Sequence, residues 1–390
     1  MQGHRSVVIT LAALCAAITL AACGSGNSTS KTAVASAGTG ATPESSTASK
    51  SSSTSSAVQQ ATSQIAQLAP ADPTIQLAPL GKPAPTGKTL DYVTCPVPIC
   101  VETAQGAQAA TKALGWKFNL INGGLTPATF TSAWDQIAQS PPSAVAGVGV
   151  LPTSAIATQL KTLIAQKIPY VSVTSPSPVG DGLDAIISGP PEVARSGTLL
   201  ANWVVSDAKG ANVDTVYVYD PSSVSIVAAY PAYTRRLHQL CPGCGEDVLK
   251  VSLADIGTKI PGEVVSYVQS HPSLKYVVMG LGDLAAGVPE ALKAAGLSSQ
   301  VKIVTRVITP TNFGDISSGG LSAGFTEEGY EAGWRAVDAI VRVLDGVPLQ
   351  SDQPIGVLHE ITASDLPSNI KVPYTVPRYQ QAFEKAWGVG

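Results

Sequence analysis

The sequence contains few charged residues, few histidines and few aromatic residues. Only 13% of its 390 residues are Asp, Glu, Lys or Arg, the formal net charge is -3, and no Lys- or Arg-rich run occurs. Neither nucleic acid nor an anionic lipid surface is therefore an obvious partner. The four histidines (His4, His238, His271 and His359) are scattered along the chain. Their scatter suggests no metal site and no histidine-based catalytic triad.

The sequence also lacks the short motifs of common enzymes. We find no Gly-rich phosphate loop, no nucleophile elbow and no metalloprotease helix. These motifs supply the phosphate-binding, nucleophilic or metal chemistry of their enzymes. The sequence therefore indicates neither a cofactor nor a chemical step.

The first 23 residues combine a positive charge with an apolar segment. Arg5 precedes an apolar run from Val7 to Ala22, which is too short for a comfortable membrane span of ~20 residues. The charged start and the small residues at the end are typical of an export signal. Leu20-Ala21-Ala22-Cys23 resembles the lipobox of a lipoprotein signal peptide. This resemblance implies that residues 1–22 are removed and that Cys23 carries a lipid; an ordinary cleaved signal or a short membrane anchor is the alternative.

Residues 23–87 are expected to form a tether. From Gly24 to about Gln67 the chain is dominated by Ser, Thr, Ala and Gly, with three charged residues and no aromatic residue. Such a segment buries too little apolar surface to offset a conformational entropy of ~1–2 kcal/mol per backbone residue. A proline-punctuated piece follows, which is stiffer. We therefore expect the folded part to begin near Lys88.

The folded part contains two close pairs of cysteines. Because an even number of cysteines in an exported chain favours disulfides, Cys95–Cys100 and Cys241–Cys244 are the simplest of the three pairings that four cysteines allow. The second pair forms a Cys-Pro-Gly-Cys motif, which thiol-redox enzymes place at a helix N-terminus, where the dipole lowers the thiol pKa. Here the motif follows a helix expected at residues 226–240, which favours a structural disulfide.

About 300 residues follow the tether, enough for two domains of ordinary size. Short apolar runs alternate with longer amphipathic runs along them. The expected strands are residues 90–94, 117–121, 144–151, 168–173, 215–219, 248–253, 276–279 and 301–304, and the expected helices are residues 104–114, 130–137, 156–164, 197–207, 226–240, 263–270 and 284–295. Near-continuous apolar strands separated by helices favour parallel sheets covered on both faces. The pattern therefore predicts an α/β protein with two doubly wound parallel-sheet lobes.

Four stretches carry a recognisable pattern, residues 106–116, 167–171, 282–296 and 319–327. In their order and spacing they resemble the type I periplasmic binding proteins, in particular the ribose-binding-like branch. The resemblance covers nearly everything from Lys88 to about Thr362. It implies two lobes joined by three crossing segments, with one solute bound in the cleft between them. The lobes can then close over the solute by hinge motion.

The resemblance also implies where the lobes begin and end. The crossing segments would lie near residues 187–191, 323–326 and 350–355. The N-terminal lobe would comprise residues 88–190 and 326–350, and the C-terminal lobe residues 191–325 and 351–390. In open parallel sheets, ligands bind outside the carboxyl ends of the strands.

The expected pocket departs from the sugar-binding pattern of this family. A Cys-Pro-Val-Pro-Ile-Cys loop at residues 95–100 replaces the family's aromatic pair. Thr174 and Val307 stand where the family has Asp, and Gly282 where it has Asn. A polyhydroxylated ligand needs carboxylates for its hydroxyl pairs. We therefore expect a solute that is less sugar-like, with charge or a few hydrogen-bonding groups on an apolar body.

Seven polar residues are candidates for ligand contact: Asn122, Thr153, Thr174, Tyr219, Asp283, Arg306 and Glu327. An alternative interpretation applies to three of them. Arg306 and Glu327 would pair with each other, and Asp283 would only cap the helix that begins at Leu284.

The sequence thus predicts a monomeric, lipid-anchored solute-binding protein on the outer face of the cytoplasmic membrane. It would present a small organic molecule to an ABC permease, without cofactor, metal or nucleic acid. A ligand sensor that signals to a membrane receptor needs the same cleft and remains an alternative. A thiol-redox enzyme using Cys241 and Cys244 is the alternative of a different class.

Overall fold

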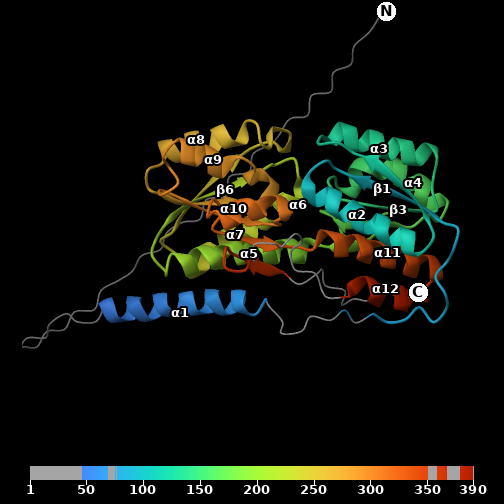
Figure 1. Cartoon of the computed structure of the whole chain (residues 1–390), viewed down its shortest axis with the longest axis horizontal. Helices are drawn as coiled ribbons and strands as arrows, with labels where there is room; N and C mark the ends of the chain where they lie inside the picture. Colours follow the sequence, from blue (N-terminus) through green and yellow to red (C-terminus); the bar gives the residue numbers. More distant parts are fainter. Residues whose placement is uncertain (1–45, 69–74, 76, 350–357, 367–377, 390) are drawn as a thin grey trace, which may run out of the picture. The chain divides into compact units, whose positions relative to one another are not determined.

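The computed structural model of the chain describes residues 46–68, 75, 77–349, 358–366 and 378–389 (Figure 1). The expected signal peptide, the lipidation site at Cys23 and the third crossing segment, at residues 350–355, lie outside these ranges. Contacts separate residues 1–46 from a second unit, Thr47–Gly390, which contains both lobes. Within the described ranges, no helix has the length and apolarity that a membrane crossing requires.

The first lobe is built on a five-stranded parallel sheet with the strand order β2-β1-β3-β4-β5. The strands are β1 (Thr89–Thr94), β2 (Lys117–Asn122), β3 (Ala144–Gly147), β4 (Tyr170–Thr174) and β5 (Ala185–Ser188). The helices are α2 (Pro98–Ala113), α3 (Pro127–Gln139), η1 (Thr153–Ile156), α4 (Ala157–Ala165), α11 (Gly329–Asp345) and α12 (Tyr379–Trp387).

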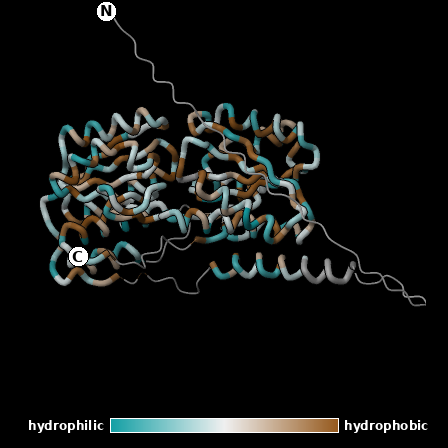
Figure 2. Tube along the Cα trace, turned by 180° about the vertical axis from the view of Figure 1, so that it is seen from behind, coloured by the Kyte–Doolittle hydropathy of each residue, from teal (hydrophilic) through white to brown (hydrophobic). Residues whose placement is uncertain are grey.

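Alternation along the strands of this sheet fills two separate cores. Ala144 and Ala146 face α2 and α11, whereas Val145 between them faces α3 and α4. Successive side chains of a strand point to opposite faces, so an apolar run supplies both cores at once. Figure 2 shows hydrophobic segments in the interior of the molecule and mixed stretches along the covering helices.

The second lobe is built on a six-stranded sheet with the order β11-β10-β9-β8-β6-β7. The strands are β6 (Asp214–Tyr219), β7 (Gly245–Lys250), β8 (Leu274–Met279), β9 (Lys302–Arg306), β10 (Ala323–Thr326) and β11 (His359–Ile361). Among the described strands of this sheet, β11 alone pairs in the antiparallel direction. The helices are α5 (Pro190–Asp207), α6 (Val224–Val227), α7 (Ala229–Leu240), η2 (Leu253–Asp255), α8 (Ile260–Ser270), η3 (Gly282–Ala285), α9 (Val288–Ala294), η4 (Pro310–Asn312) and α10 (Phe313–Ser317).

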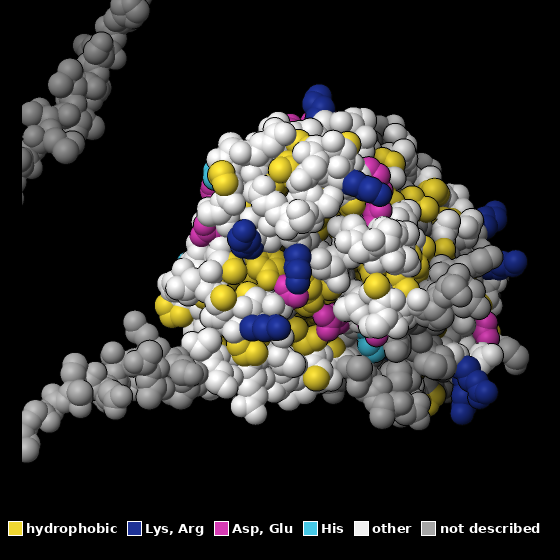
Figure 3. Space-filling view, turned by 60° about the vertical axis from the view of Figure 1, so that its left-hand side comes forward, with side chains coloured by type: hydrophobic (Ala, Val, Ile, Leu, Met, Phe, Trp, Pro, Cys, Tyr) yellow, Lys and Arg dark blue, Asp and Glu magenta, His cyan; other side chains and the backbone are white. Residues whose placement is uncertain are grey.

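Helices cover both faces of the second sheet, with α8 and α9 on one side and α5 and α7 on the other (Figure 1). The expected fold class, two doubly wound α/β lobes, is therefore confirmed. On the face shown in Figure 3, basic and acidic side chains are interspersed with hydrophobic ones.

The described chain crosses between the sheets at two of the expected places. It leaves β5 of the first sheet and enters α5, which packs on the second lobe with α7. It returns from β10 of the second sheet through Glu327 and Glu328 into α11, which packs against α2.

Helix α12 lies in the first lobe, although residues 351–390 were expected in the second. Tyr379, Phe383 and Trp387 recur every fourth residue and form one buried face. Trp387 stacks on Trp334 of α11 with ring centroids 5.4 Å apart, and its indole N–H donates to Asp338 at 2.7 Å. The apolar face of α12 packs on Trp334 of α11, and the order of the crossing segments does not reveal this contact.

The expected tether also contains structure that its composition did not suggest. Helix α1 spans Ser46–Ala66, and Ala61 on it is fully buried against the second lobe. Gln64 accepts hydrogen bonds from Asn202 of α5 at 2.8 Å and from Arg236 of α7 at 3.0 Å. Tertiary packing of a narrow apolar stripe thus overrides the weak helix propensity of Ser and Thr.

The proline-punctuated piece before Lys88 is also packed on the fold. The backbone N–H groups of Leu80 and Ala84 donate to the carbonyls of Ala386 and Trp387 at the end of α12. The folded part therefore begins before Lys88, because this piece is hydrogen-bonded to the C-terminal helix.

Candidate functional site

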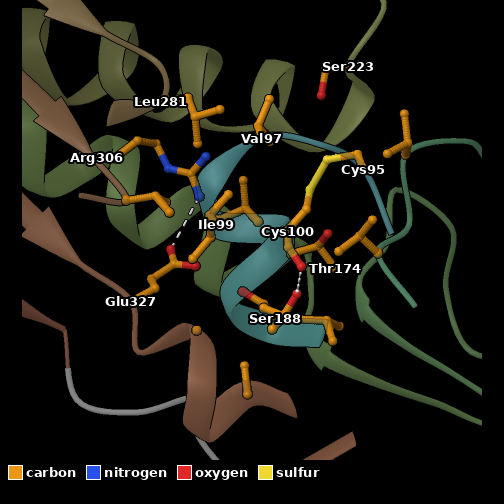
Figure 4. A pocket seen from close by; sticks show the side chains of 18 of the residues that line it. Cys95, Val97, Ile99, Cys100, Thr174, Ser188, Ser223, Leu281, Arg306 and Glu327 are labelled. Atoms are coloured by element: carbon orange, nitrogen blue, oxygen red, sulfur yellow. Dashed lines mark hydrogen bonds and ion pairs between the residues drawn. A yellow bond between two sulfur atoms is a disulfide. The ribbon is translucent and has the colours of Figure 1, made fainter. Parts of the chain in front are cut away.

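A cavity of about 100 Å³ lies between the two lobes at the carboxyl ends of their parallel strands (Figure 4). This is the edge at which open α/β sheets bind ligands. The lining residues are Cys95, Val97, Ile99, Cys100, Thr103, Val148, Val150, Val173, Thr174, Ser188, Val193, Ser223, Leu253, Leu281, Arg306, Val307, Glu327, Glu328, Gly329 and Ala332. Both lobes and the second crossing segment contribute, and most of the lining side chains are apolar.

The loop after β1 forms one wall of the cavity. The disulfide that was expected between Cys95 and Cys100 is present, with Cα atoms 5.4 Å apart (Figure 4). Pro98 stands at the start of α2, and the Thr94 hydroxyl donates to the Cys100 carbonyl at 3.0 Å. The disulfide, the proline and this hydrogen bond restrict the backbone of the loop where the family has its aromatic pair.

Arg306 at the end of β9 is held by protein groups on all three of its nitrogens. Its Nε donates to the Ser196 hydroxyl at 2.8 Å and its Nη1 to the Gly280 carbonyl at 3.3 Å. Its Nη2 pairs with Glu327 at 3.2 Å (Figure 4). The side chains of Arg306 and Glu327 are only 5% and 12% exposed. Both residues line the cavity, but they satisfy each other, as the alternative interpretation of the sequence had it.

Glu328 is the neighbouring acid on the crossing segment and was not among the sequence candidates. It lines the cavity and is 2% exposed, and neither of its carboxyl oxygens accepts a hydrogen bond of normal geometry. Burial, followed by the charges of Glu102 and Glu331, raises its pKa to about 9, against a lowering effect of the Tyr330 backbone N–H. The adjacent acids Glu327 and Glu328, directly after a strand that ends at a crossing, were the sequence signal for this residue.

Ser188 is a second cavity-lining group without a partner. It is 1% exposed, and its hydroxyl makes no hydrogen bond among the described residues. It ends β5 at the first crossing segment, and Figure 4 shows it at the base of the cavity beside Thr174. Buried polar groups are normally hydrogen-bonded, so unpartnered ones that line a cavity mark places where a ligand or water binds.

Asp283 lies beside the cavity rather than on its lining. It is 2% exposed, and burial raises its pKa to about 7, although the Ile99 backbone N–H of the other lobe lowers it. Glu102 on α2 of the first lobe also has its pKa raised to about 7, by burial and by the charge of Asp283. Two carboxyl groups from opposite lobes are thus close enough to repel each other.

Of the four remaining sequence candidates, the structure places one on the lining of the cavity. Thr174 ends β4 and lines the cavity. Asn122 is exposed and accepts a hydrogen bond from the Gly124 backbone, and the Thr153 backbone donates to Ser177. Tyr219 stacks on the ring of Tyr230 at 5.6 Å. The last three candidates are not among the residues that line this cavity.

Val307 and Gly282, which both depart from the family pattern, contact each other. Val307 has a φ of 54°, a left-handed conformation that is strained for a β-branched residue. A Cβ atom at position 282 would lie 2.6 Å from the Val307 carbonyl oxygen, so the glycine makes room for this backbone. Strain of this kind is often found at ligand sites, and Val307 lines the cavity.

The Cys241–Cys244 motif is disulfide-bonded, as expected, with Cα atoms 5.4 Å apart. Cys241 is the C-cap of α7, and both cysteines are buried in the core of the second lobe. The motif therefore follows a helix instead of beginning one. This placement favours the structural role over thiol-redox chemistry.

Comparisons with known proteins agree with this architecture. Residues 98–348 match the family described as periplasmic binding protein domain. No curated protein sequence matches the chain.

Several solved structures resemble the chain. A sugar ABC transporter protein from Yersinia enterocolitica has a TM-score of 0.66 at 14% identity, covering 80% of this chain and 98% of its own. The 5-methylthioribose transporter solute-binding protein of Thermotoga lettingae has a TM-score of 0.64 at 16% identity, covering 78% and 94%. The glucose-galactose binding protein GanP of Geobacillus stearothermophilus has a TM-score of 0.64 at 15% identity, covering 73% and 100%. At such identities the likeness concerns the fold.

Proposed function

Since the chain belongs to the periplasmic binding protein family, whose members are binding proteins and not enzymes, we propose that it is a lipid-anchored solute-binding protein that delivers a small organic molecule to an ABC importer. The family is extracytoplasmic. The observation that carries the proposal is the mostly apolar cavity at the strand ends of both sheets, lined by both lobes and a crossing segment.

The mechanism of such a protein is equilibrium binding coupled to closure. A solute in the cavity contacts residues of both lobes, such as Val173 of the first and Leu281 of the second. It therefore binds the closed arrangement more tightly than an open one, and this difference in affinity drives closure. An importer can then distinguish loaded from empty protein by the surface that the closed lobes present. Transport proteins among the structural neighbours support this assignment.

A scattering experiment tests the proposal. The purified chain is titrated with sugars, polyols, nucleosides, amino acids and small amines while its radius of gyration and melting temperature are measured. We expect one class of compound to raise the melting temperature through preferential binding to the folded state and to reduce the radius of gyration. Enrichment of a permease and its ATPase with the closed chain would support the importer, whereas enrichment of a membrane receptor would support the sensor.

The lipid anchor is a separate part of the proposal. The Leu-Ala-Ala-Cys sequence at residues 20–23 supports removal of residues 1–22 and lipidation of Cys23. Together with a tether between Cys23 and helix α1, this would hold a monomeric binding domain at the outer face of the cytoplasmic membrane. A Cys23→Ser chain should leave the membrane fraction and lose incorporation of labelled palmitate. Retention of the label in that variant would contradict lipidation at this residue.

A further inference from the structure

We propose that the solute is a small organic cation, an amine on a compact apolar body, whose charged group binds at Glu328. This inference rests on the proposed solute-binding function and adds the chemical class of the solute. It is carried by the balance of charge and hydrogen bonding in the cavity.

The basic charge of the cavity is already neutralised. Arg306 is the one basic residue among the described residues that line it, and its nitrogens contact Ser196, Gly280 and Glu327. An anionic solute would have to break the buried pair of Arg306 and Glu327 to obtain a counter-charge. Removing one partner of a buried pair leaves the other uncompensated, which is strongly unfavourable.

The acidic side of the cavity, in contrast, has no counter-charge. Both carboxyl oxygens of Glu328 are buried, and neither makes a hydrogen bond of normal geometry. Glu102 on α2 and Asp283 on η3 add further acid close by. Glu331 on α11 is paired with Arg335 of the same helix. Burial raises the pKa of the phenols of Tyr330 and of Tyr379 on α12, and the charge of Glu328 raises both further. The electrostatic field around this carboxyl therefore favours a cation.

A purely structural role does not account for Glu328. It occupies the N-cap position of α11, where a side chain commonly accepts a hydrogen bond from the helix backbone. Its carboxyl makes no capping hydrogen bond of normal geometry, and the nearby Tyr330 backbone N–H only partly offsets the effect of burial on its pKa. A buried acid without a full set of hydrogen bonds is costly, and a ligand that donates hydrogen bonds removes this cost.

The walls of the cavity define the rest of the solute. Among the described lining residues none is aromatic, so a sugar ring finds no stacking surface. Nine of the twenty lining residues are valine, leucine or isoleucine, and they come from both lobes. The hydroxyl of Ser188 supplies a further unpartnered polar contact. A compact aliphatic body with one ammonium group fits this combination of surfaces.

Proton release gives the inference a specific signature. The raised pKa of Glu328 means that this carboxyl is largely protonated near neutral pH in the empty protein. An alkylammonium group keeps its own charge at that pH, so its binding should expel the proton of Glu328. Affinity for the amine should therefore rise with pH until Glu328 is ionised in the empty protein.

The experiment uses the full chain and matched small probes. Isobutylamine and butylamine are compared with the carboxylic acids and alcohols of the same carbon skeletons, with glucose and ribose added. Calorimetry in buffers of different ionisation enthalpy measures affinity and released protons together. We expect the amines to bind about 10- to 100-fold more tightly than the matched acids and alcohols, with proton release.

Two variants of the cavity and one control variant locate the effect. Glu328→Gln should abolish both the preference for amines and the proton release, whereas Glu290→Gln, which changes an exposed acid on α9, should preserve both. Ser188→Ala should weaken the binding of amines and alcohols alike, and it tests the site even if Glu328→Gln does not fold.

The outcomes separate this inference from the proposed function. Amines that bind no better than their matched acids, or a preference that survives Glu328→Gln, would overturn the organic cation. The same proton release with calcium or magnesium ions alone would also overturn it. Binding of glucose or ribose with closure of the lobes would overturn the cation while solute capture stands. No binding by any probe would count against both.

Discussion

Arg306 was predicted as a candidate for ligand contact, but its hydrogen bonds indicate a structural role. The resemblance placed it at the cavity, and it does line the cavity. Its contacts to Ser196, Gly280 and Glu327, however, join the end of β9 to α5, to the chain beyond β8 and to the second crossing segment. We therefore expect Arg306 to hold the hinge side of the cavity together.

Replacing Arg306 should consequently affect stability. Arg306→Met leaves Glu327 without its counter-charge in a nearly buried position, and we expect a loss of about 3–5 kcal/mol in the free energy of unfolding. Lys302→Met is the matched control, because Lys302 lies on the same strand but forms an exposed pair with Asp207. That variant should lose at most about 1 kcal/mol. Urea denaturation measures both, and equal losses would refute the structural role of Arg306.

At this scale the sequence could predict only part of the site. Thr174 and Arg306 were found because each ends a strand, and strand ends meet at the cavity edge. Glu328 was not predicted, although it follows Glu327 directly after a strand, because its lack of hydrogen-bond partners depends on the fold around it. Asn122 and Tyr219 also end strands, but Asn122 accepts a hydrogen bond from the Gly124 backbone and Tyr219 stacks on Tyr230, and neither is among the residues that line the cavity.

Helix α12 belongs to the first lobe through a small number of large aromatic contacts. Trp387→Ala removes a fully buried indole that stacks on Trp334 and donates to Asp338. We expect a loss of about 3–5 kcal/mol in stability, with increased hydrogen exchange in α11. Gln380→Ala changes an exposed residue of the same helix and should be close to neutral. Exchange that increased only in the second lobe would contradict the packing of α12 described for the first.

Helix α1 should stabilise the second lobe from outside the family's domain. Deleting residues 46–68 removes Gln64 from Asn202 and Arg236 and uncovers the apolar surface that Ala61 covers. We expect a lower melting temperature and faster hydrogen exchange in α5 and α7, with solute affinity unchanged. Deleting residues 24–45 instead is the control, because it retains α1. Unchanged exchange in α5 and α7 after the first deletion would show that α1 does not stabilise them.

Elements were predictable where their signal is internal to the segment. The strands were found because buried parallel strands are apolar along most of their length, as in Val216 to Val218. Helix α1 was not predicted, because the face that it packs on the second lobe has few apolar side chains, among them Ala57, Ala61 and Ile65, and the segment is rich in Ser and Thr. Such a helix becomes stable only through the surface on which it packs, and that surface is distant in the sequence.

On the scale of the whole molecule, the two lobes bring like charges together. Glu102 belongs to α2 of the first lobe and Asp283 to η3 of the second, and each has its pKa raised to about 7 in the arrangement described. Burial is the larger cause for both, and the charge of Asp283 adds to it for Glu102. The raised pKa values mean that approach of the lobes favours the protonated acids over the ionised ones.

This linkage makes closure dependent on pH. A carboxyl whose pKa is raised stabilises the closed, folded arrangement fully below its ordinary pKa of about 4, and this contribution is lost as pH rises through about 7. We therefore expect the ligand-free chain to have a smaller radius of gyration and a higher melting temperature at about pH 5 than at about pH 8. The double variant Glu102→Gln/Asp283→Asn should reduce this dependence, because neither side chain can then ionise, and the dependence that remains should come from Glu328, whose pKa is also raised by burial.

A matched pair of surface acids controls for the general effect of charge. Asp181→Asn/Asp255→Asn removes one acid from each lobe, and neither is among the residues that line the cavity. This control should keep the pH dependence of the parent chain. Small-angle scattering and thermal unfolding across the pH range measure both variants. A parent chain whose compactness and stability rise with pH over this range would contradict the coupling, because the sign of the linkage follows from acids that are ionised more easily when the lobes are apart.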